Sequence, residues 1–447
     1  MKPRFAPAAF ALLASALLPA SALAQGRDAA APLDFKGRYI VSVSDADMVS
    51  SAYVNGQLGP REGRDALSVI PLTGDPRNWR AAEVFVSNSV AGPPASVDVT
   101  PDGRFAFVVE TFTPRPDNDA PHTFADLRIG NKLTVVDLSN PAAPRIASVV
   151  DVPARPDSVR INARGDLVAV SFNPDRGAGT RTPLGLFRFA NGTLSPITTP
   201  AIPGWDLERS RLIDLDWHPT ENIVAMIDEH LNTVRFARIT DELTVVPFGN
   251  VVDIERAPYR VEFTPDGAHV VINALYWGPD IAGRWIEAPK GSVLTVRMNA
   301  ETRNGQPRHA FVSRIETGVS PEGLAVSPDG RWVATTNLER SYLPYDDNRI
   351  TWFSSITLAR LDQRTGQLTR VGTFNYDGIL PEAAVFDNSG NFLAVATYDH
   401  FDDRRRGGSI DFWRIQADPL DQSNVQLIKT ERSVPVARGA HSMVIAR

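Results

Sequence analysis

The chain has 447 residues, no cysteine and a formal net charge of −6. Its length exceeds that of a usual single-core domain, which favours a modular or ring-like fold. The absence of cysteine excludes disulfides, thiol catalysis and cysteine-ligated metal sites, and the acidic balance without a basic, aromatic-rich run argues against nucleic acid as a partner.

Residues 1–24 have the pattern of an export signal. Lys2 and Arg4 precede an apolar run, and Ala22-Leu23-Ala24 fits the small-residue pattern of a cleavage site. The run is too short for a spanning helix, and an uncleaved anchor is the alternative. We therefore expect a cleaved signal peptide (1–24), a leader (25–37) and a mature chain without a membrane span, located in the periplasm or secreted.

Three strand-like runs open the region that begins at residue 38. They read RYIVSVSD from Arg38, ALSVIPL from Ala66 and AEVFVSNS from Ala82, each with alternating apolar residues. Three strands are one fewer than a four-stranded unit needs, so we expect the missing strand to come from elsewhere in the chain.

A sequence pattern then recurs six times: a strand with alternating apolar residues, a tight turn and a second strand. The segments read SVDVTPDGRFAFVVE from Ser96, SVRINARGDLVAVS from Ser158, DLDWHPTENIVAMID from Asp214, RVEFTPDGAHVVIN from Arg260, GLAVSPDGRWVATTN from Gly323 and AAVFDNSGNFLAVAT from Ala383. Proline fixes φ and glycine accepts a positive φ, so Pro-Asp-Gly makes the turn. The turns lie 45 to 63 residues apart, a period typical of repeated supersecondary units.

Two further strands follow most of these hairpins. Third strands are KLTVVDLS, SVLTVRM, SSITLARLD and SIDFWRI, and fourth strands are RIASVVDV, HAFVSRIE, LTRVGTF and VQLIKTE. Four antiparallel strands per unit predict a propeller blade. The final HSMVIAR, from His441, fits a first strand and completes the three N-terminal ones. The prediction is an all-β, seven-bladed β-propeller (38–447) whose ring is closed by the C-terminal strand.

Segments such as GLAVSPDGRWVATTN and SVDVTPDGRFAFVVE resemble those of the YVTN-type, lactonase-like seven-bladed β-propellers. The resemblance covers essentially the whole mature chain, although the string YVTN itself is absent. That family contains lactone hydrolases, a cycloisomerase and many proteins without a known activity. The resemblance therefore implies the fold, and lactone hydrolysis as one of several expected functions.

The predicted topology puts all Pro-Asp-Gly turns on one face and long, dissimilar loops on the other. Function usually resides in such loops, so we expect a small polar or anionic ligand at the loop face of the channel. As catalytic candidates we take a histidine base, a glutamate acid or orienter and an arginine that holds an anion: His441, His400, Glu322, Glu382 and Arg260. As ligand-binding candidates we take the polar residues at strand starts and ends: Asp157, Asp228, Asn273, Asn337, Asp399 and Arg438.

Two other readings stay open from the sequence. Hard oxygen ligands around the channel suit Ca²⁺ or Mg²⁺, and a three-histidine site from His230, His400 and His441 is a weaker version of a metal centre. A monomeric scaffold without turnover, whose channel holds ordered water, is the third reading, because a propeller fold does not choose a function.

Overall fold

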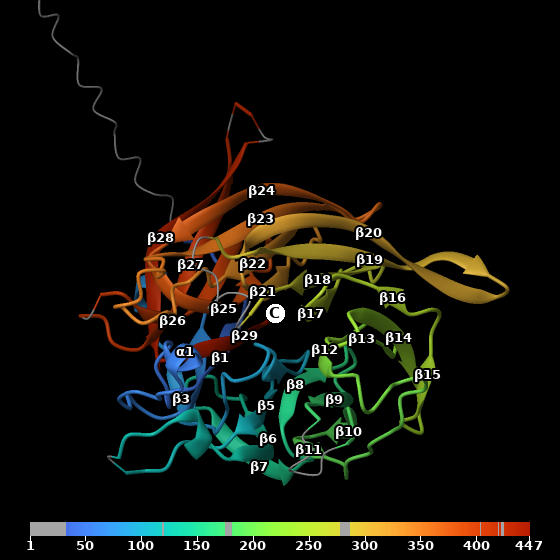
Figure 1. The fold of residues 1–447 in the computed structure, drawn as a ribbon, viewed down its shortest axis with the longest axis horizontal. Coiled ribbons are helices and arrows are strands. Elements are labelled where there is room, and N and C mark those ends of the chain that lie inside the picture. Colours follow the sequence, from blue (N-terminus) through green and yellow to red (C-terminus); the bar gives the residue numbers. More distant parts are fainter. Residues whose placement is uncertain are drawn as a thin grey trace, which may run out of the picture. The chain divides into compact units, whose positions relative to one another are not determined.

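Seven antiparallel sheets hold nearly all the regular structure, and each has the strand order expected of a propeller blade (Figure 1). The computed structural model describes residues 33–118, 120–174, 181–277, 287–402, 404–418, 420–421 and 424–447. The predicted signal peptide and most of the predicted leader lie outside these residues. The seven-bladed fold predicted from the repeats is confirmed.

The blades follow the chain in order, and in each the inner strand is named first. Blade 1 contains β29 (Ala440–Ala446), β1 (Tyr39–Ser44), β2 (Ala66–Pro71) and β3 (Ala82–Phe85). Blade 2 contains β4 (Val97–Val99), β5 (Phe105–Phe112), β6 (Ile129–Asp137) and β7 (Arg145–Asp151). Blade 3 contains β8 (Pro156–Ile161), β9 (Leu167–Phe172), β10 (Leu184–Ala190) and β11 (Thr193–Leu194).

The remaining four blades repeat this plan, and blades 5 to 7 have the longest outer strands. Blade 4 contains β12 (Leu212–Trp217), β13 (Ile223–Asp228), β14 (Thr233–Ile239) and β15 (Val245–Pro247), and β16 (Val252–Asp253) also pairs with β14. Blade 5 contains β17 (Pro258–Phe263), β18 (His269–Ala274), β19 (Lys290–Arg303) and β20 (Gln306–Val319). Blade 6 contains β21 (Pro321–Val326), β22 (Trp332–Asn337), β23 (Ser354–Asp362) and β24 (Gln367–Tyr376). Blade 7 contains β25 (Gly378–Phe386), β26 (Phe392–His400), β27 (Gly408–Ala417) and β28 (Val425–Val436).

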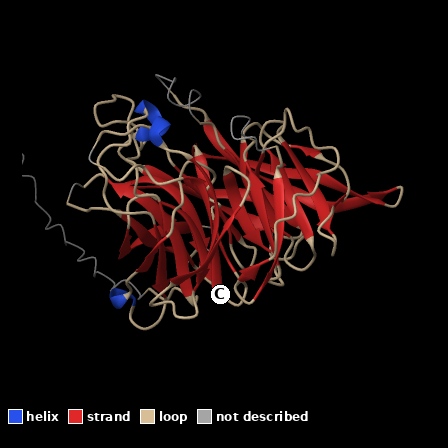
Figure 2. Cartoon of the chain, turned by 90° about the horizontal axis from the view of Figure 1, so that it is seen from below, coloured by secondary structure: helices blue, strands red, loops and turns tan. Residues whose placement is uncertain are grey.

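Helix is confined to short pieces in the described chain. These are α1 (Ala52–Asn55) and the 3₁₀ turns η1 (Pro76–Asn78) and η2 (Phe124–Asp126). No helix among the described residues is long and apolar enough to cross a membrane. Figure 2 shows the strands from the side, with connecting loops at both ends of the blades.

The C-terminal strand closes the ring as predicted. β29 pairs antiparallel with β1, with Tyr39 opposite Ala446 and Ser44 opposite Ala440. It also contacts the inner strands β25 and β4 of the two neighbouring blades. Figure 1 shows this red strand beside the blue N-terminal one. β29 therefore completes blade 1 and packs between the inner strands of blades 7 and 2.

Each inner hairpin is held by its turn sequence. In Thr100-Pro101-Asp102-Gly103, the Gly103 amide donates to the Thr100 carbonyl at 2.7 Å, and φ of Gly103 is +70°. The Asp102 carboxylate accepts from the Thr100 hydroxyl at 2.6 Å and from the Arg104 amide at 2.9 Å. We call the end of the blades that carries these turns the turn face and the opposite end the loop face.

The apolar core lies between blades. In β8, Val159 and Ile161 pack in one buried cluster with Phe107 and Val135 of blade 2. The alternating apolar residues of each inner strand thus bury one blade against the next, which is why a single blade could not be stable alone.

Candidate functional site

A repeated backbone irregularity marks the loop-face ends of four inner strands. Pro156, Pro258 and Pro321 are the first residues of their strands and Pro381 lies near the start of β25, and strand pairing slips immediately after each of the four. The residue before each proline has a positive φ: Arg155 (64°), Ala257 (58°), Ser320 (50°) and Leu380 (51°). Non-glycine residues adopt this conformation at a cost of about 1–3 kcal/mol, and such strain concentrates at functional sites.

At each slip, the residue that follows the proline has no paired residue on the neighbouring strand. These residues are Asp157, Tyr259, Glu322 and Glu382, and all lie in the loop-face half of their inner strands. Bulges of this kind re-aim side chains beside active sites. The structure therefore brings Glu322 and Glu382, two of the predicted catalytic residues, to the same end of neighbouring inner strands.

Glu322 and Glu382 form a buried acidic pair, with 6% and 1% of their surface exposed. Burial raises the pKa of Glu322 to about 7, against the opposing effects of the Tyr259 hydroxyl and the Arg260 charge. Burial and the negative charges of Glu322 and Asp45 hold the pKa of Glu382 well above its usual range. Among the described residues, Oε2 of Glu382 has no hydrogen-bond partner. Burial thus favours the protonated form of both carboxyls, and for Glu382 the negative charge of Glu322 adds to this effect.

Four tyrosines surround the pair, and all are more than half buried. The Tyr259 hydroxyl donates to the Gly92 carbonyl at 2.9 Å and the Tyr398 hydroxyl to the Met48 carbonyl at 2.6 Å. The Tyr53 hydroxyl donates to the Val90 carbonyl at 3.1 Å. The Tyr342 hydroxyl has no partner among the described residues, and the negative charge of Glu322 adds to burial in raising its pKa.

Residues 46–65, which connect β1 to β2 and include α1, bring Tyr53 close to the carboxyl pair; we call them the cover segment. Its Tyr53 ring meets Trp277 at 5.3 Å between centroids, and Trp277 meets Tyr342 at 4.9 Å. Arg438 donates to the carbonyls of Ala46 and Pro60. Arg115 donates to those of Asp47 and Gly59. The cover segment is thus held by guanidiniums on its backbone and by aromatic packing.

Three buried aspartates lie at the base of the cover segment. Oxygen atoms of Asp45, Asp47 and Asp65 fall within 4.8 Å of one another, a spacing that could hold a cation. However, the Asp45 carboxylate already accepts from the Asp47 and Val90 amides, and the Asp65 carboxylate from those of Ala46 and Asn88. These hydrogen bonds to backbone amides occupy carboxylate oxygens of the set. Because Ca²⁺ prefers six or more oxygen ligands, the three aspartates fit such a hard cation poorly.

The two predicted histidine bases do not meet. His441 is fully buried, its Nε2 lies 2.8 Å from the Asn88 amide oxygen, and burial lowers its pKa to about 3. Burial and the Arg405 charge lower the pKa of His400 to about 4, and the other charges that act on it are Asp411, Lys429 and Asp377. Both imidazoles are neutral near pH 7, and no contact among the described residues joins them.

The remaining predicted residues form separate contacts. The Arg211 guanidinium bridges Asp157 at 2.9 Å to Glu229 at 2.8 Å, and Asp228 accepts the Arg211 amide. Asn273 accepts the Arg260 amide and donates to the carbonyls of Pro321 and Glu322, so it links blades 5 and 6. Asn337 donates to Ser355 and Thr357, and Asp399 accepts the amide of His400. Arg260 binds Asp214 at 2.8 Å.

None of the four tyrosines of the loop-face cluster was among the predicted site residues. Tyr259 follows a proline of its inner strand just as Glu322 and Glu382 do, so the shared Pro-X step could have identified it. Tyr53 belongs to the cover segment, whose sequence carries no repeat. Nothing in the sequence predicts that it would lie over the channel.

The raised pKa of Glu322 predicts a pH-dependent stability difference. The folded carboxyl binds its proton up to about pH 7, whereas 4.5 is its ordinary value. Its contribution to stability is therefore full below pH 4.5 and is lost as pH rises through 7. We expect the melting temperature of Glu322→Gln, relative to that of wild type, to rise as the pH increases from 4.5 to 7. Glu221→Gln, on an exposed turn, serves as the control, and a constant difference between Glu322→Gln and wild type would contradict the buried-acid assignment.

No protein-family model and no curated protein matches the chain. Solved structures do: the periplasmic gluconolactonase PpgL of Pseudomonas aeruginosa is 17% identical with a TM-score of 0.56, over 92% of this chain and 99% of that one. A candidate 6-phosphogluconolactonase of Bacteroides uniformis is 16% identical and a functionally unknown protein of Desulfotomaculum acetoxidans 12%, both with a TM-score of 0.58 and the same coverage. Identities this low show the fold alone: the chain is a seven-bladed β-propeller with the fold of the lactonase-like propellers.

Proposed function

We propose that the protein is an exported hydrolase of small lactones, with its active site at the loop-face cluster of Glu322, Glu382 and their tyrosines. The observation that carries the proposal is the carboxyl pair, because a Pro-Glu step followed by the same strand slip places both glutamates. Solved structures that share the fold include a periplasmic gluconolactonase, which supports both the substrate class and export.

Opening a lactone needs a base, an acid and a donor for the oxyanion. In the proposed reaction, ionised Glu322 takes a proton from water as the water oxygen attacks the carbonyl carbon. Protonated Glu382 then gives its proton to the ring oxygen as the ring C–O bond breaks, leaving the open hydroxy acid. Two carboxyls with separated pKa values suit these two roles.

The unpartnered Tyr342 hydroxyl is the proposed donor to the developing oxyanion. A donor already aimed at the reacting oxygen stabilises the transition state without reorganisation, an effect worth about 3–4 kcal/mol in other enzymes. Because Glu382 is only 1% exposed, substrate entry requires the cover segment to move away from the pair.

Hydrolysis of glucono-δ-lactone by the purified mature chain tests this function. We expect Glu322→Gln and Glu382→Gln each to lower kcat/KM by about 10²–10⁴-fold, the usual contribution of a general acid or base. Glu339→Gln is the matched control, since Glu339 is also a loop-face glutamate of blade 6 but bonds to Ser355. It should keep wild-type activity.

Binding without turnover is the competing outcome. If lactones or their hydroxy acids bind at the loop face and wild type hydrolyses none of a panel of aldonolactones, the protein is a binding propeller and the hydrolase proposal is wrong. Equal activity of wild type and both glutamine variants would likewise place catalysis elsewhere.

A further inference from the structure

The turn-face end of the channel holds a second cavity, remote from the cover segment. Its volume is about 360 Å³, within the range of small-molecule sites. Residues from all seven inner strands line it, and Arg447 lies at its edge with its guanidinium bonded to Asn388 at 3.0 Å. No residue of the loop-face acidic pair contributes to this lining.

The wall of this cavity has a charged part and an apolar part. At one equivalent position of each inner strand, blades 2 to 5 place charged residues: Asp98, Arg160, Asp216 and Glu262. Blades 6, 7 and 1 place Ala325, Val385 and Val444 at the same position. Because these blades are consecutive around the ring, the cavity has one charged wall and one apolar wall.

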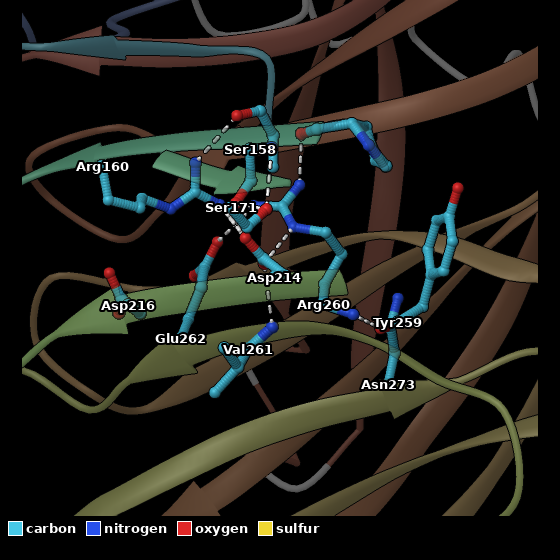
Figure 3. A network of polar contacts seen from close by, with 12 residues as sticks. Ser158, Arg160, Ser171, Asp214, Asp216, Tyr259, Arg260, Val261, Glu262 and Asn273 are labelled. Atoms are coloured by element: carbon cyan, nitrogen blue, oxygen red, sulfur yellow. Dashed lines mark hydrogen bonds and ion pairs between the residues drawn. The ribbon is translucent and has the colours of Figure 1, made fainter. Parts of the chain in front are cut away.

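The two buried arginines of the charged wall are already paired. Arg160 and Arg260 both bind Asp214, at 3.3 Å and 2.8 Å, and Figure 3 shows the aspartate between the two guanidiniums. The Arg260 guanidinium also donates to the Pro94 carbonyl. An anionic ligand would have to compete with Asp214 for these cations.

The three carboxylates of the charged wall differ in how many of their oxygens already accept hydrogen bonds. Asp98 accepts the amides of Ile161 and Val99 through its two oxygens. Asp216 accepts the Phe263 amide at 2.7 Å and Glu262 the Val326 amide at 3.0 Å, each through one oxygen. Among the described contacts, Oδ1 of Asp216 has no bond and Oε1 of Glu262 has only Arg260, at 3.9 Å. These two neighbouring acids therefore keep acceptor capacity toward the cavity.

We propose that this cavity binds a small organic cation, a primary amine with an apolar body. The ammonium group would bind Asp216 and Glu262, and the body would lie against the wall of Ala325, Val385 and Val444. A divalent metal fits less well, because the apolar wall offers no oxygen to complete its six or more ligands. Burial raises the pKa of Asp216 to about 7 although the Arg160 charge opposes the rise, and the negative charges of Glu262 and Asp214 add to it.

Calorimetric titration of the mature chain tests the proposal with three probes of equal length, n-hexylamine, hexan-1-ol and hexanoate, and with methylamine, which lacks the apolar body. We expect saturable binding of one hexylamine, at least tenfold tighter than the alcohol, the acid or methylamine. These comparisons use the wild-type protein, so they do not depend on the folding of any variant.

A paired variant locates the site. The double variant Asp216→Asn, Glu262→Gln keeps the carbonyl oxygens that accept the Phe263 and Val326 amides, and should lower the affinity for hexylamine at least tenfold. Asp98 lies on the same wall, but both of its oxygens already accept hydrogen bonds, so Asp98→Asn should change this affinity less than threefold. The proposal is wrong if hexylamine gives no saturable heat, if hexanoate or hexanol binds as tightly, if the paired variant binds like wild type, or if Ca²⁺ occupies the site and excludes the amine.

Discussion

Truncation of the chain after Gly439 is expected to abolish cooperative folding. The cut removes β29, which supplies the inner strand of blade 1 and pairs with β1 along its whole length. Buried Val41 and Val43 of β1 would lose their neighbours, and the ring would open between β25 and β4. The native margin of a protein is about 5–15 kcal/mol, less than this loss of burial and pairing removes. Thermal unfolding followed by circular dichroism, with dye binding to exposed apolar surface, checks the result.

Deletion of Arg447 alone is the matched control, since this residue is exposed and lies beyond β29. It should melt like the full chain. A truncated protein that still unfolds in one sharp transition within a few degrees of wild type would show that the ring does not need its closing strand.

Asp214→Ala is expected to lower the free energy of unfolding by about 3–5 kcal/mol. The Asp214 side chain is wholly buried and pairs with both Arg160 and Arg260. It also accepts the Val261 amide of the next blade at 3.2 Å. Its removal leaves two buried guanidiniums without their shared counter-ion, and burial of an unpaired charge is far more costly than loss of an exposed pair. Urea unfolding measures the difference.

Glu221→Ala provides the comparison. Glu221 pairs with Arg238 at 3.2 Å, but both side chains are almost half exposed, so its loss should change stability by less than about 1 kcal/mol. If Asp214→Ala proved as mild as Glu221→Ala, the network in Figure 3 would not hold the channel together.

The fold could be predicted because its signals are local. Each inner hairpin carries its own turn, as in Thr100 to Gly103, and the final strand has the inner-strand pattern without a turn after it. The recurring strand–turn–strand pattern alone predicts which end of the blades carries the tight turns and which end carries the long loops. Blade 4 follows the same pattern, and its shortest repeat spacing accompanies a loop of only four residues (229–232) between β13 and β14.

The candidate site could be predicted only in part. Strand starts converge on the channel, which is why Glu322 and Glu382 could be named. Side-chain partners depend on residues far away in sequence: His441 is neutral because it is buried against Asn88, and Asn273 is used to join two blades. The cover segment and the positive φ before each of the four inner-strand prolines are tertiary features without a sequence repeat strong enough to reveal them.

The catalytic role of the carboxyl pair is tested most directly by the pH dependence of kcat/KM for glucono-δ-lactone, after subtraction of spontaneous hydrolysis. We expect wild-type activity to rise with pH through an ionisation near 7, because the Glu322 carboxyl must lose its proton to act as base, and Glu322→Gln to lack that step. Lactone loss equal to that in protein-free buffer at every pH would contradict the hydrolase assignment.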